Sequence, residues 1–252
     1  MPQNDSTVEL LTGKDKSGKK SRWPARLDYL QSATGLFLAL FISFHILFES
    51  SILFGKNAMY TLTKMFEGEP FIEAEPLIIT GLAFIIFSMF IFHAFLAMRK
   101  FPASYKEYQR YHAHRKLLKH DDTNLWLIQI TTGFVMFFLG SVHLYMMMSM
   151  PGKIGPYASS DRIYSDWMWP LYLLLLIAVV LHAWVGVYRL IIKWGWFDGK
   201  DPRKNRKRSK MMIKVLIVAY LVIGLASLAN YMKIGYEHQD SYGERYKMEK
   251  MK

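Results

Sequence analysis

Apolar residues dominate five long stretches of the chain, and short polar segments separate these stretches. A helix needs about 20 mostly apolar residues to cross a hydrocarbon core about 30 Å thick, and each stretch is long enough. The strands of a membrane barrel would instead be short and alternating, whereas these runs are continuous. The pattern predicts an all-α integral membrane bundle with transmembrane helices at about 29–54, 77–98, 125–150, 167–192 and 211–232.

These five helices predict one transmembrane domain over 29–232, between a polar segment at 1–28 and a tail at 233–252. The loops are too short to hold a catalytic domain, so another subunit would have to supply the site for any water-soluble substrate. Because the first segment lacks an apolar core and a cleavage site, we expect no signal peptide.

Lysine and arginine are concentrated in alternate polar segments. The N-terminal segment and the second and fourth loops are densely basic, whereas the first loop carries Glu67, Glu69, Glu73 and Glu75. Basic loops stay on the cytoplasmic side, which predicts a bacterial inner-membrane protein with a cytoplasmic N-terminus and a periplasmic C-terminus. The net charge of +12 therefore reflects residues that flank lipid rather than a nucleic-acid partner.

The chain contains no cysteine. Disulfides, thiolate metal sites, iron–sulfur clusters and covalently attached c-type haem are therefore excluded as features of this chain itself. Any metal or haem that it binds must use histidine, methionine or oxygen ligands.

Four of the eight histidines lie inside apolar runs, one in each of the first four helices: His45, His93, His143 and His182. An ionisable side chain inside a membrane is costly and normally faces a partner or ligand in the bundle interior. A single such histidine would be explained by a hydrogen bond between helices. Four histidines on four helices would require that explanation four times.

The depths of these histidines can be compared through the 1.5 Å rise per helical residue. His45 and His143 lie on outward-running helices, about nine and seven residues from their outer ends. His93 and His182 lie on inward-running helices, about five and ten residues from their inner ends. The sequence therefore predicts an outer pair and an inner pair.

Two neutral imidazoles from facing helices are the ligands of a six-coordinate b-type haem, which transfers electrons. Small residues one turn or nearly one turn from the inner histidines and His143 would leave room for a flat macrocycle, namely Ala97, Gly140, Ala178 and Gly186. They could equally be ordinary helix contacts. A zinc or copper site, or a proton relay in a transporter, is disfavoured by the split into pairs and by the lack of an inverted repeat.

The sequence resembles the dihaem cytochrome b subunit of menaquinol:fumarate reductases and related succinate:quinone oxidoreductases, of the single-subunit, five-helix type. The likeness covers nearly the whole chain. The stretches that carry it are QSATGLFL (31–38), HAFLAMRKFP (93–102), FFLGSVHLY (137–145), MWPLYL (168–173) and KWGWFDG (193–199).

The resemblance implies that His45 and His143 hold an outer haem and that His93 and His182 hold an inner one. It also implies contacts to haem propionates from Gln31, Ser32, Trp126 and Lys193, although Trp126 and Lys193 could simply anchor the interface. The implied partners are an iron–sulfur subunit and a flavoprotein with covalently bound FAD on the cytoplasmic face, in a dimer of heterotrimers.

The resemblance further assigns the acceptor of the menaquinol proton to Glu67, in the segment FEGEP. A carboxylate there could accept a hydroquinone proton and release it outward. From the sequence alone Glu69 serves nearly as well, and a solvated acidic loop is the plainer explanation of both.

Two residues depart from the family pattern. Glu49 follows His45 by four residues, on the same helical face, where an apolar residue is expected; we expect it to line the quinone pocket or the proton exit. Val180 stands two residues before His182 in place of a glutamate thought to carry protons inward. The complex could therefore be electrogenic, use another proton route, or run toward succinate oxidation with the membrane potential.

The sequence thus predicts a membrane anchor that oxidises menaquinol near Glu67 and passes electrons through two haems to an iron–sulfur partner. One alternative is a dihaem cytochrome b of a hydrogenase or formate dehydrogenase. An alternative of another class is a haem-free anchor or transporter.

Overall fold

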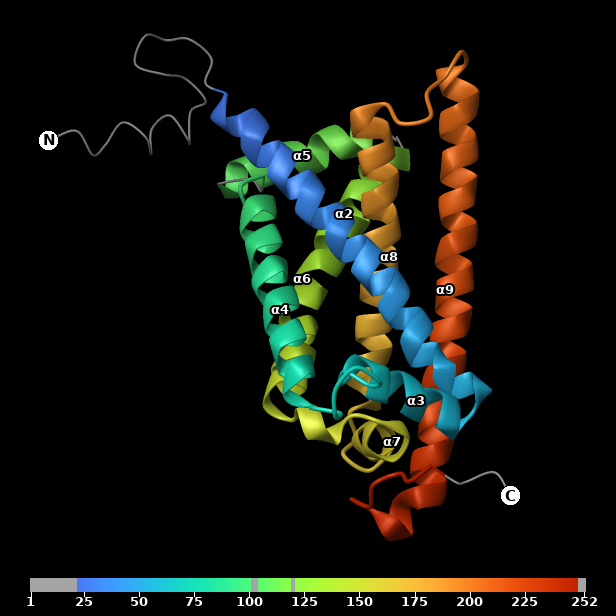
Figure 1. The fold of residues 1–252 in the computed structure, drawn as a ribbon. Coiled ribbons are helices and arrows are strands. Elements are labelled where there is room, and N and C mark those ends of the chain that lie inside the picture. The colour runs from blue at the N-terminus through green and yellow to red at the C-terminus, as the bar shows by residue number, and fades with distance from the viewer. Residues whose placement is uncertain (1–21, 101–103, 119–120, 249–252) are drawn as a thin grey trace, which may run out of the picture.

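The computed structural model describes residues 22–100, 104–118 and 121–248, and these residues form helices and connecting segments without a strand. The long helices are α2 (Trp23–Glu49), α4 (Leu77–Met98), α6 (Asp121–Ser149), α8 (Trp169–Trp194) and α9 (Pro202–His238) (Figure 1). All five are long and apolar enough to cross a membrane. The predicted all-α membrane bundle is confirmed.

Several helices extend beyond the predicted bounds. Helix α2 begins at Trp23 rather than at 29 and leads into a 3₁₀ segment, Ser50–Phe54. Helix α9 begins at Pro202 rather than at 211 and ends at His238 rather than at 232. The prediction followed the apolar runs, but a helix satisfies its own backbone and can continue into polar sequence. Residues 1–21 and 249–252 of the predicted end segments lie outside the described residues.

The helix starts and stops follow local chemistry. The Asp201 side chain accepts a hydrogen bond from the Lys204 backbone N–H at 3.1 Å and so caps α9, with Pro202 in the first turn. Helix α8 ends at Gly195, whose left-handed φ of 65° suits glycine.

The four histidine-bearing helices form a closed ring. Helix α2 packs against α4 and α8, and α6 packs against the same two helices. Helix α9 lies outside the ring, against α8 and the outer part of α2. The ring therefore encloses a space to which each of these four helices can present a side chain.

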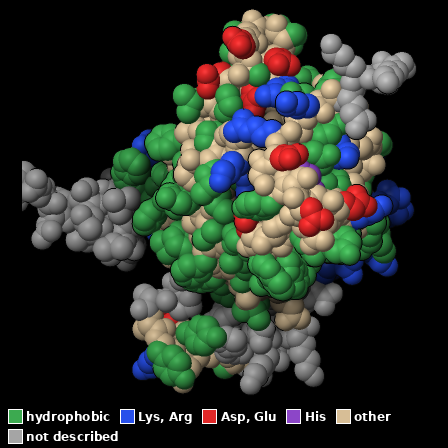
Figure 2. All heavy atoms as spheres, turned by 90° about the horizontal axis from the view of Figure 1, so that it is seen from below, with side chains coloured by type: hydrophobic (Ala, Val, Ile, Leu, Met, Phe, Trp, Pro, Cys, Tyr) green, Lys and Arg blue, Asp and Glu red, His purple; other side chains and the backbone are tan. Residues whose placement is uncertain are grey.

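The two ends of the bundle differ. We call the end with the start of α2, the surface helix α5 (Tyr105–Leu118) and the α8–α9 loop the basic end (top of Figure 1). The opposite, capped end is covered by α3 (Lys56–Phe66) and α7 (Pro156–Tyr164), with short 3₁₀ segments at Pro151–Lys153 and Gln239–Ser241. Figure 2 looks onto the capped end, where charged side chains of both signs gather inside a hydrophobic surround. The three surface helices occupy segments that the sequence analysis treated as loops.

Hydrogen bonds connect the end of α9 and the residues after it to α7 and to the turn that follows α7. His238 Nδ1 lies 2.9 Å from Asp161 Oδ1 of α7, and the Gly243 N–H donates to the other oxygen of that carboxylate at 3.0 Å. The Tyr242 phenol donates to Asp166 at 2.9 Å, and this carboxylate raises the pKa of the phenol. Helix α7 is thereby held between α8 and the end of the chain.

The crossing of α7 and α9 depends on Gly235. A Cβ at this position would lie 2.5 Å from the Tyr164 Cβ and 2.6 Å from the Ser160 carbonyl oxygen. Because backbone cannot yield as a flexible side chain can, we expect Gly235→Ala to destabilise the protein by about 1–3 kcal/mol. The midpoint of thermal unfolding, followed by circular dichroism, measures this loss.

Gly81→Ala in α4 is the matched control, because a Cβ at Gly81 has nothing within 4 Å. We expect its midpoint to stay level or rise, since alanine favours helix more than glycine does. Equal midpoints for the two variants would contradict the close crossing.

Candidate functional site

A single continuous cavity of about 940 Å³ runs inside the ring and is lined by all four membrane histidines. Its lining extends from Gln31 and Lys193 at the basic end to Glu49 and Tyr231 near the capped end. The volume lies at the upper limit of ordinary ligand pockets. The cavity can therefore hold a large cofactor or more than one ligand.

His93 of α4 is held by α2. Its Nδ1 lies 3.0 Å from Thr34 Oγ1, and the Thr34 hydroxyl donates its own proton to the Leu30 carbonyl at 2.8 Å. The hydroxyl oxygen must then accept from the ring, so Nδ1 carries the proton and Nε2 is left as a potential metal ligand. The ring comes so near α2 that a Cβ on Gly35 would lie 2.8 Å from His93 Cε1.

His182 of α8 is held by α6 in the same manner. Its Nδ1 donates to the Gln129 carbonyl oxygen at 2.8 Å and lies 3.4 Å from Thr132 Oγ1. A Cβ on Gly133 would lie 3.0 Å from His182 Cε1. The two inner histidines thus share one arrangement, in which a neighbouring helix fixes Nδ1 and a glycine gives the ring room.

His45 and His143 face each other across the cavity with ring centres 6.1 Å apart. Two imidazoles that bind one metal through bonds of about 2 Å have ring centres about 6 Å apart. His143 Nδ1 is buried without a hydrogen-bond partner, and Tyr172 packs edge-on against the ring at 5.6 Å. This pair has the separation that a shared iron requires.

The four histidines fall on two levels. His45 follows Gly35 by ten residues on α2, and His143 follows Gly133 by ten residues on α6. Since Gly35 and Gly133 mark the positions of His93 and His182, both helices place the outer level about 15 Å from the inner level.

Polar groups gather where the cavity meets the basic end. Lys193 Nζ lies 3.1 Å from Ser32 Oγ, and Gln31 Oε1 is buried without a partner. All four predicted propionate-binding residues line the cavity, namely Gln31, Ser32, Trp126 and Lys193. The Ser32 hydroxyl, the Lys193 ammonium group and the amide N–H of Gln31 are donors of the kind that a bound carboxylate needs.

Sequence reasoning missed Asp28, which organises these cations. Its carboxylate lies 2.8 Å from Lys100 Nζ, 3.1 Å from Arg99 and 3.5 Å from Lys193 Nζ. The three bases come from two different helix ends, α4 and α8, and Asp28 lies at the start of α2. No sequence spacing indicates such a cluster.

At the opposite end, Glu49 lines the cavity and accepts a hydrogen bond from the buried Tyr231 phenol of α9 at 3.0 Å. Among the described residues that line the cavity, Glu49 is the one carboxylate. Glu49 follows His45 by one helical turn, and both residues line the same cavity.

Glu67 lies at the end of α3, is 3% exposed, and pairs with Lys64 Nζ at 2.5 Å. The preceding residue, Phe66, lines the cavity, whereas Glu67 is not part of the lining. Glu69 lies on the exposed part of the following turn. The structure therefore buries Glu67 next to a cavity-lining residue and leaves Glu69 exposed.

Arg162 of α7 was also missed. It is 8% exposed, lines the cavity beside Tyr172, and donates to the Lys153 carbonyl. Arg162 lies in the segment between α6 and α8, where the Gly155–Pro156 pair is a helix-start signal that the sequence analysis did not use. The resulting helix α7 turns a guanidinium toward the His143 level.

The predicted small residues are only partly at the cavity. Ala97, Gly140 and Gly186 line it, but Ala178 does not and instead packs within the bundle at 3% exposure. Ala178 therefore matches the alternative given for these residues, an ordinary contact between helices. Val180, at 1% exposure, packs with Ile46 and Val179.

The lining fits two bis-histidine haems. Two imidazole pairs lie on two levels, the walls between them are apolar, and cations and polar groups occupy both ends. The described residues contain no group of three or more histidine, cysteine or carboxylate side chains that could hold a metal ion. A zinc site, which usually gathers three or four ligands, is therefore disfavoured.

The close approach of His93 to α2 is testable with Gly35→Ala, whose Cβ would strike His93 Cε1. The ring must move, and we expect loss of about half the bound haem and of the inner haem signal. Reduced-minus-oxidised spectra and haem extraction measure both quantities.

Gly81→Ala in α4 provides the control, because a Cβ at Gly81 has nothing within 4 Å and Gly81 is not among the residues that line the cavity. It should retain both haems. A full haem complement in Gly35→Ala would disprove the assignment of His93 as a ligand held against α2.

Comparison with known proteins identifies the family of the chain. The sequence model of the family described as succinate dehydrogenase/fumarate reductase transmembrane subunit matches residues 106–223. The chain is 51% identical to the fumarate reductase cytochrome b subunit of Wolinella succinogenes over 238 residues, 94% of this chain and 93% of that one. It is 45% identical to the protein of the same name in Helicobacter pylori strain J99 over 240 residues, 95% of this chain and 92% of that one.

Proposed function

The chain belongs to the family of succinate dehydrogenase and fumarate reductase transmembrane subunits, and from this premise we propose that it is the dihaem, menaquinol-oxidising subunit of a fumarate reductase. The observation that carries the proposal is the single cavity with two histidine levels. The named relatives favour fumarate reductase over a hydrogenase or formate dehydrogenase. The same route in reverse would serve succinate oxidation.

In this proposal His45 and His143 would hold the outer haem, and His93 and His182 would hold the inner haem. The bound haems would supply one-electron carriers between the two ends of the bundle. The chain's own contribution is to fix the inner imidazoles through Thr34 and the Gln129 carbonyl. Fixed rings keep the ligand nitrogens directed into the cavity.

The ends of the cavity supply the charges that haem carboxylates need. Gln31, Ser32, Trp126 and Lys193 would bind those of the inner haem. Arg162 lies where it could bind one of the outer haem, because it is a buried guanidinium in the cavity wall. Charge-assisted hydrogen bonds of this kind are about twice as strong as neutral ones.

The basic end is the proposed docking side for the iron–sulfur subunit and the FAD-containing flavoprotein, where fumarate would be reduced. This places the basic end in the cytoplasm of a bacterial inner membrane and the capped end in the periplasm. The complete complex is proposed to be a dimer of heterotrimers.

Menaquinol would be oxidised beneath the cap. Glu67 is proposed as the proton acceptor, because it is a buried carboxylate directly after the cavity-lining Phe66 and is held by Lys64. Glu49 would take part as a residue of the quinone pocket or the proton exit, since it lines the cavity and is held by Tyr231.

We expect Glu67→Gln in the complete complex to slow menaquinol-driven fumarate reduction by on the order of a hundredfold or more, because an amide cannot accept the proton. Reduction of fumarate by an artificial donor to the partner subunits should be unchanged. Glu69→Gln, at the exposed position two residues away, is the matched control and should retain menaquinol activity. Loss in both variants, or in neither, would contradict the role of Glu67.

The same assay applies to Glu49→Gln, with both haems verified spectroscopically. Normal menaquinol turnover in this variant would exclude Glu49 from the pocket and from the proton exit. Tyr231→Phe, which removes only the hydroxyl that holds Glu49, is its companion variant.

The path between the two haem levels is apolar. The residues of α2 that line the cavity between Gly35 and His45 are all apolar, namely Leu38, Ala39, Phe41, Ile42 and Phe44. Val180 packs in a hydrophobic cluster and cannot carry a proton. Inward electron transfer without an accompanying proton moves charge, at about 2.3 kcal/mol per electron per 100 mV.

We therefore expect menaquinol oxidation by fumarate in proteoliposomes to generate a membrane potential, negative on the side of the partner subunits. A potential-sensitive dye measures it, and an uncoupler should accelerate turnover. Turnover that generates no potential would show that protons reach the basic end by another route.

A further inference from the structure

Helix α9 has two clearly separated faces. One face is buried against the ring and the cap and carries Ser209, Ile213, Gly224, Ser227 and Tyr231. The opposite face carries large exposed apolar side chains, each 59–61% exposed, at Met211, Val215, Val218 and Val222. Their spacing of three and four residues forms one stripe along the helix. Because the helix crosses a membrane, this stripe faces lipid.

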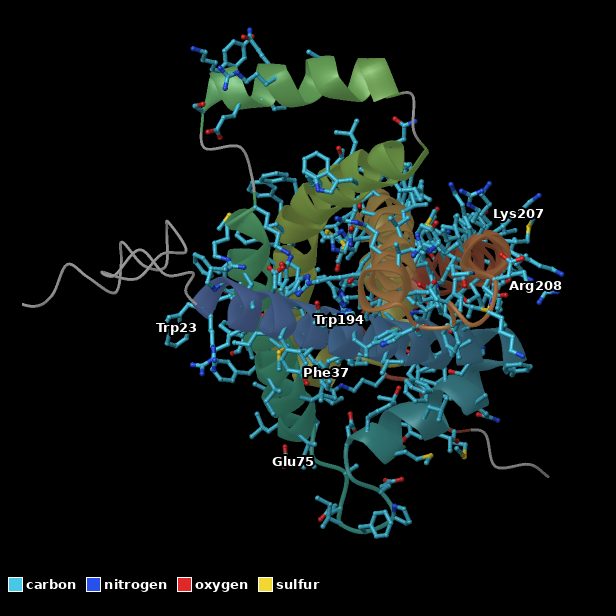
Figure 3. All side chains as sticks on the ribbon, turned by 90° about the horizontal axis from the view of Figure 1, so that it is seen from above. Trp23, Phe37, Glu75, Trp194, Lys207 and Arg208 are labelled. Carbon is cyan, nitrogen blue, oxygen red and sulfur yellow. The ribbon has the colours of Figure 1, made fainter. Side chains whose placement is uncertain are left out.

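Three exposed cations continue this stripe at the basic end: Lys204, Lys207 and Arg208. They precede Met211 by seven, four and three residues, so they share its side of the helix. Figure 3, which looks onto the basic end, shows Lys207 and Arg208 directed outward from α9 and away from the other helices.

These cations differ from Arg206, which binds a carboxylate of the α8–α9 loop. Arg206, on another side of the helix, is bound by both carboxylate oxygens of Asp198, at 3.2 and 3.3 Å. Within the part of the chain that the structure describes, no carboxylate forms an ion pair with Lys204, Lys207 or Arg208. Their charge is directed to something outside this chain.

The height of these side chains matches lipid phosphates. The segment 211–232 of α9 is mostly apolar, apart from the exposed Lys214 near its start, and at 1.5 Å per residue it is about 33 Å long, enough for a hydrocarbon core of about 30 Å. Lys207 and Arg208 lie about 5–6 Å beyond Met211 along the axis. The headgroup region extends about 5–7 Å beyond each side of the core.

We propose that Lys204, Lys207 and Arg208 form a binding site for the phosphate of an anionic glycerophospholipid, whose acyl chains lie along the stripe from Met211 to Val222. A zwitterionic lipid would bind these cations less tightly, because the cation of its own headgroup offsets the negative charge of its phosphate. A water-soluble partner subunit fits less well, because the cations stand directly above the lipid-facing stripe. The lipid would hold the outermost helix, which lies beside the haem-binding ring rather than within it.

The test is native mass spectrometry of the detergent-purified complex, titrated with phosphatidylglycerol or phosphatidylcholine of the same acyl chains. We expect the complex to bind phosphatidylglycerol more tightly. Each surface cation contributes about fivefold, so K207Q/R208Q should weaken phosphatidylglycerol binding by on the order of 25-fold. Phosphatidylcholine binding should be nearly unchanged.

K106Q/R110Q is the matched control, because it removes two exposed cations of α5 at the same end of the bundle. It should retain the preference for phosphatidylglycerol. The proposal is overturned by equal binding of the two lipids, by equal losses in the two double variants, or by displacement of the lipid by inorganic phosphate alone. Loss of the iron–sulfur subunit from K207Q/R208Q would instead assign this face to protein docking. Menaquinol activity of the variant separately tests the proposed function.

Discussion

The structure depends on how an imidazole can be accommodated in the interior of a membrane bundle. A histidine there has two ring nitrogens, and leaving either one without a partner in an apolar medium is costly. For His93 and His182 a neighbouring helix takes one nitrogen, through Thr34 and the Gln129 carbonyl. The other nitrogen is left for a ligand, which makes the bundle a receptor for metal-bearing groups rather than a self-contained core.

That requirement explains the ring of helices. Each inner histidine needs a backbone or hydroxyl partner within about 3 Å, and this is possible only where the facing helix carries a glycine. Gly35 and Gly133 supply those positions, on α2 and α6. Because the same two helices carry His45 and His143 ten residues further on, fixing the inner level also fixes the outer one. Helix α9 needs no such partner and packs outside the ring.

The two ends of the cavity receive different chemistry from their surroundings. At the basic end, cations converge from α4 and α8 around Asp28, an arrangement suited to anionic groups and to an acidic partner surface. Beneath the cap, two carboxylates occupy different sites: Glu67 pairs with Lys64, and Glu49 faces the cavity beside Tyr231. The cavity lining between the two histidine levels is apolar. In the proposed function, electrons would cross this stretch through the haems, and its side chains would not carry protons.

The sequence by itself determined the fold class, the number of membrane helices and the four histidines, because hydrophobic length and the cost of an intramembrane charge are properties of local sequence. It also identified Gln31, Ser32, Trp126 and Lys193, through a resemblance rather than through spacing. Only the tertiary structure placed Arg162 and Tyr231 at the cavity, gathered three cations around Asp28 and left Ala178 out of the lining. These residues come from different helices or from a surface helix, and their positions depend on how the helices rotate and cross. Such contacts between distant segments leave no periodic signal in the chain.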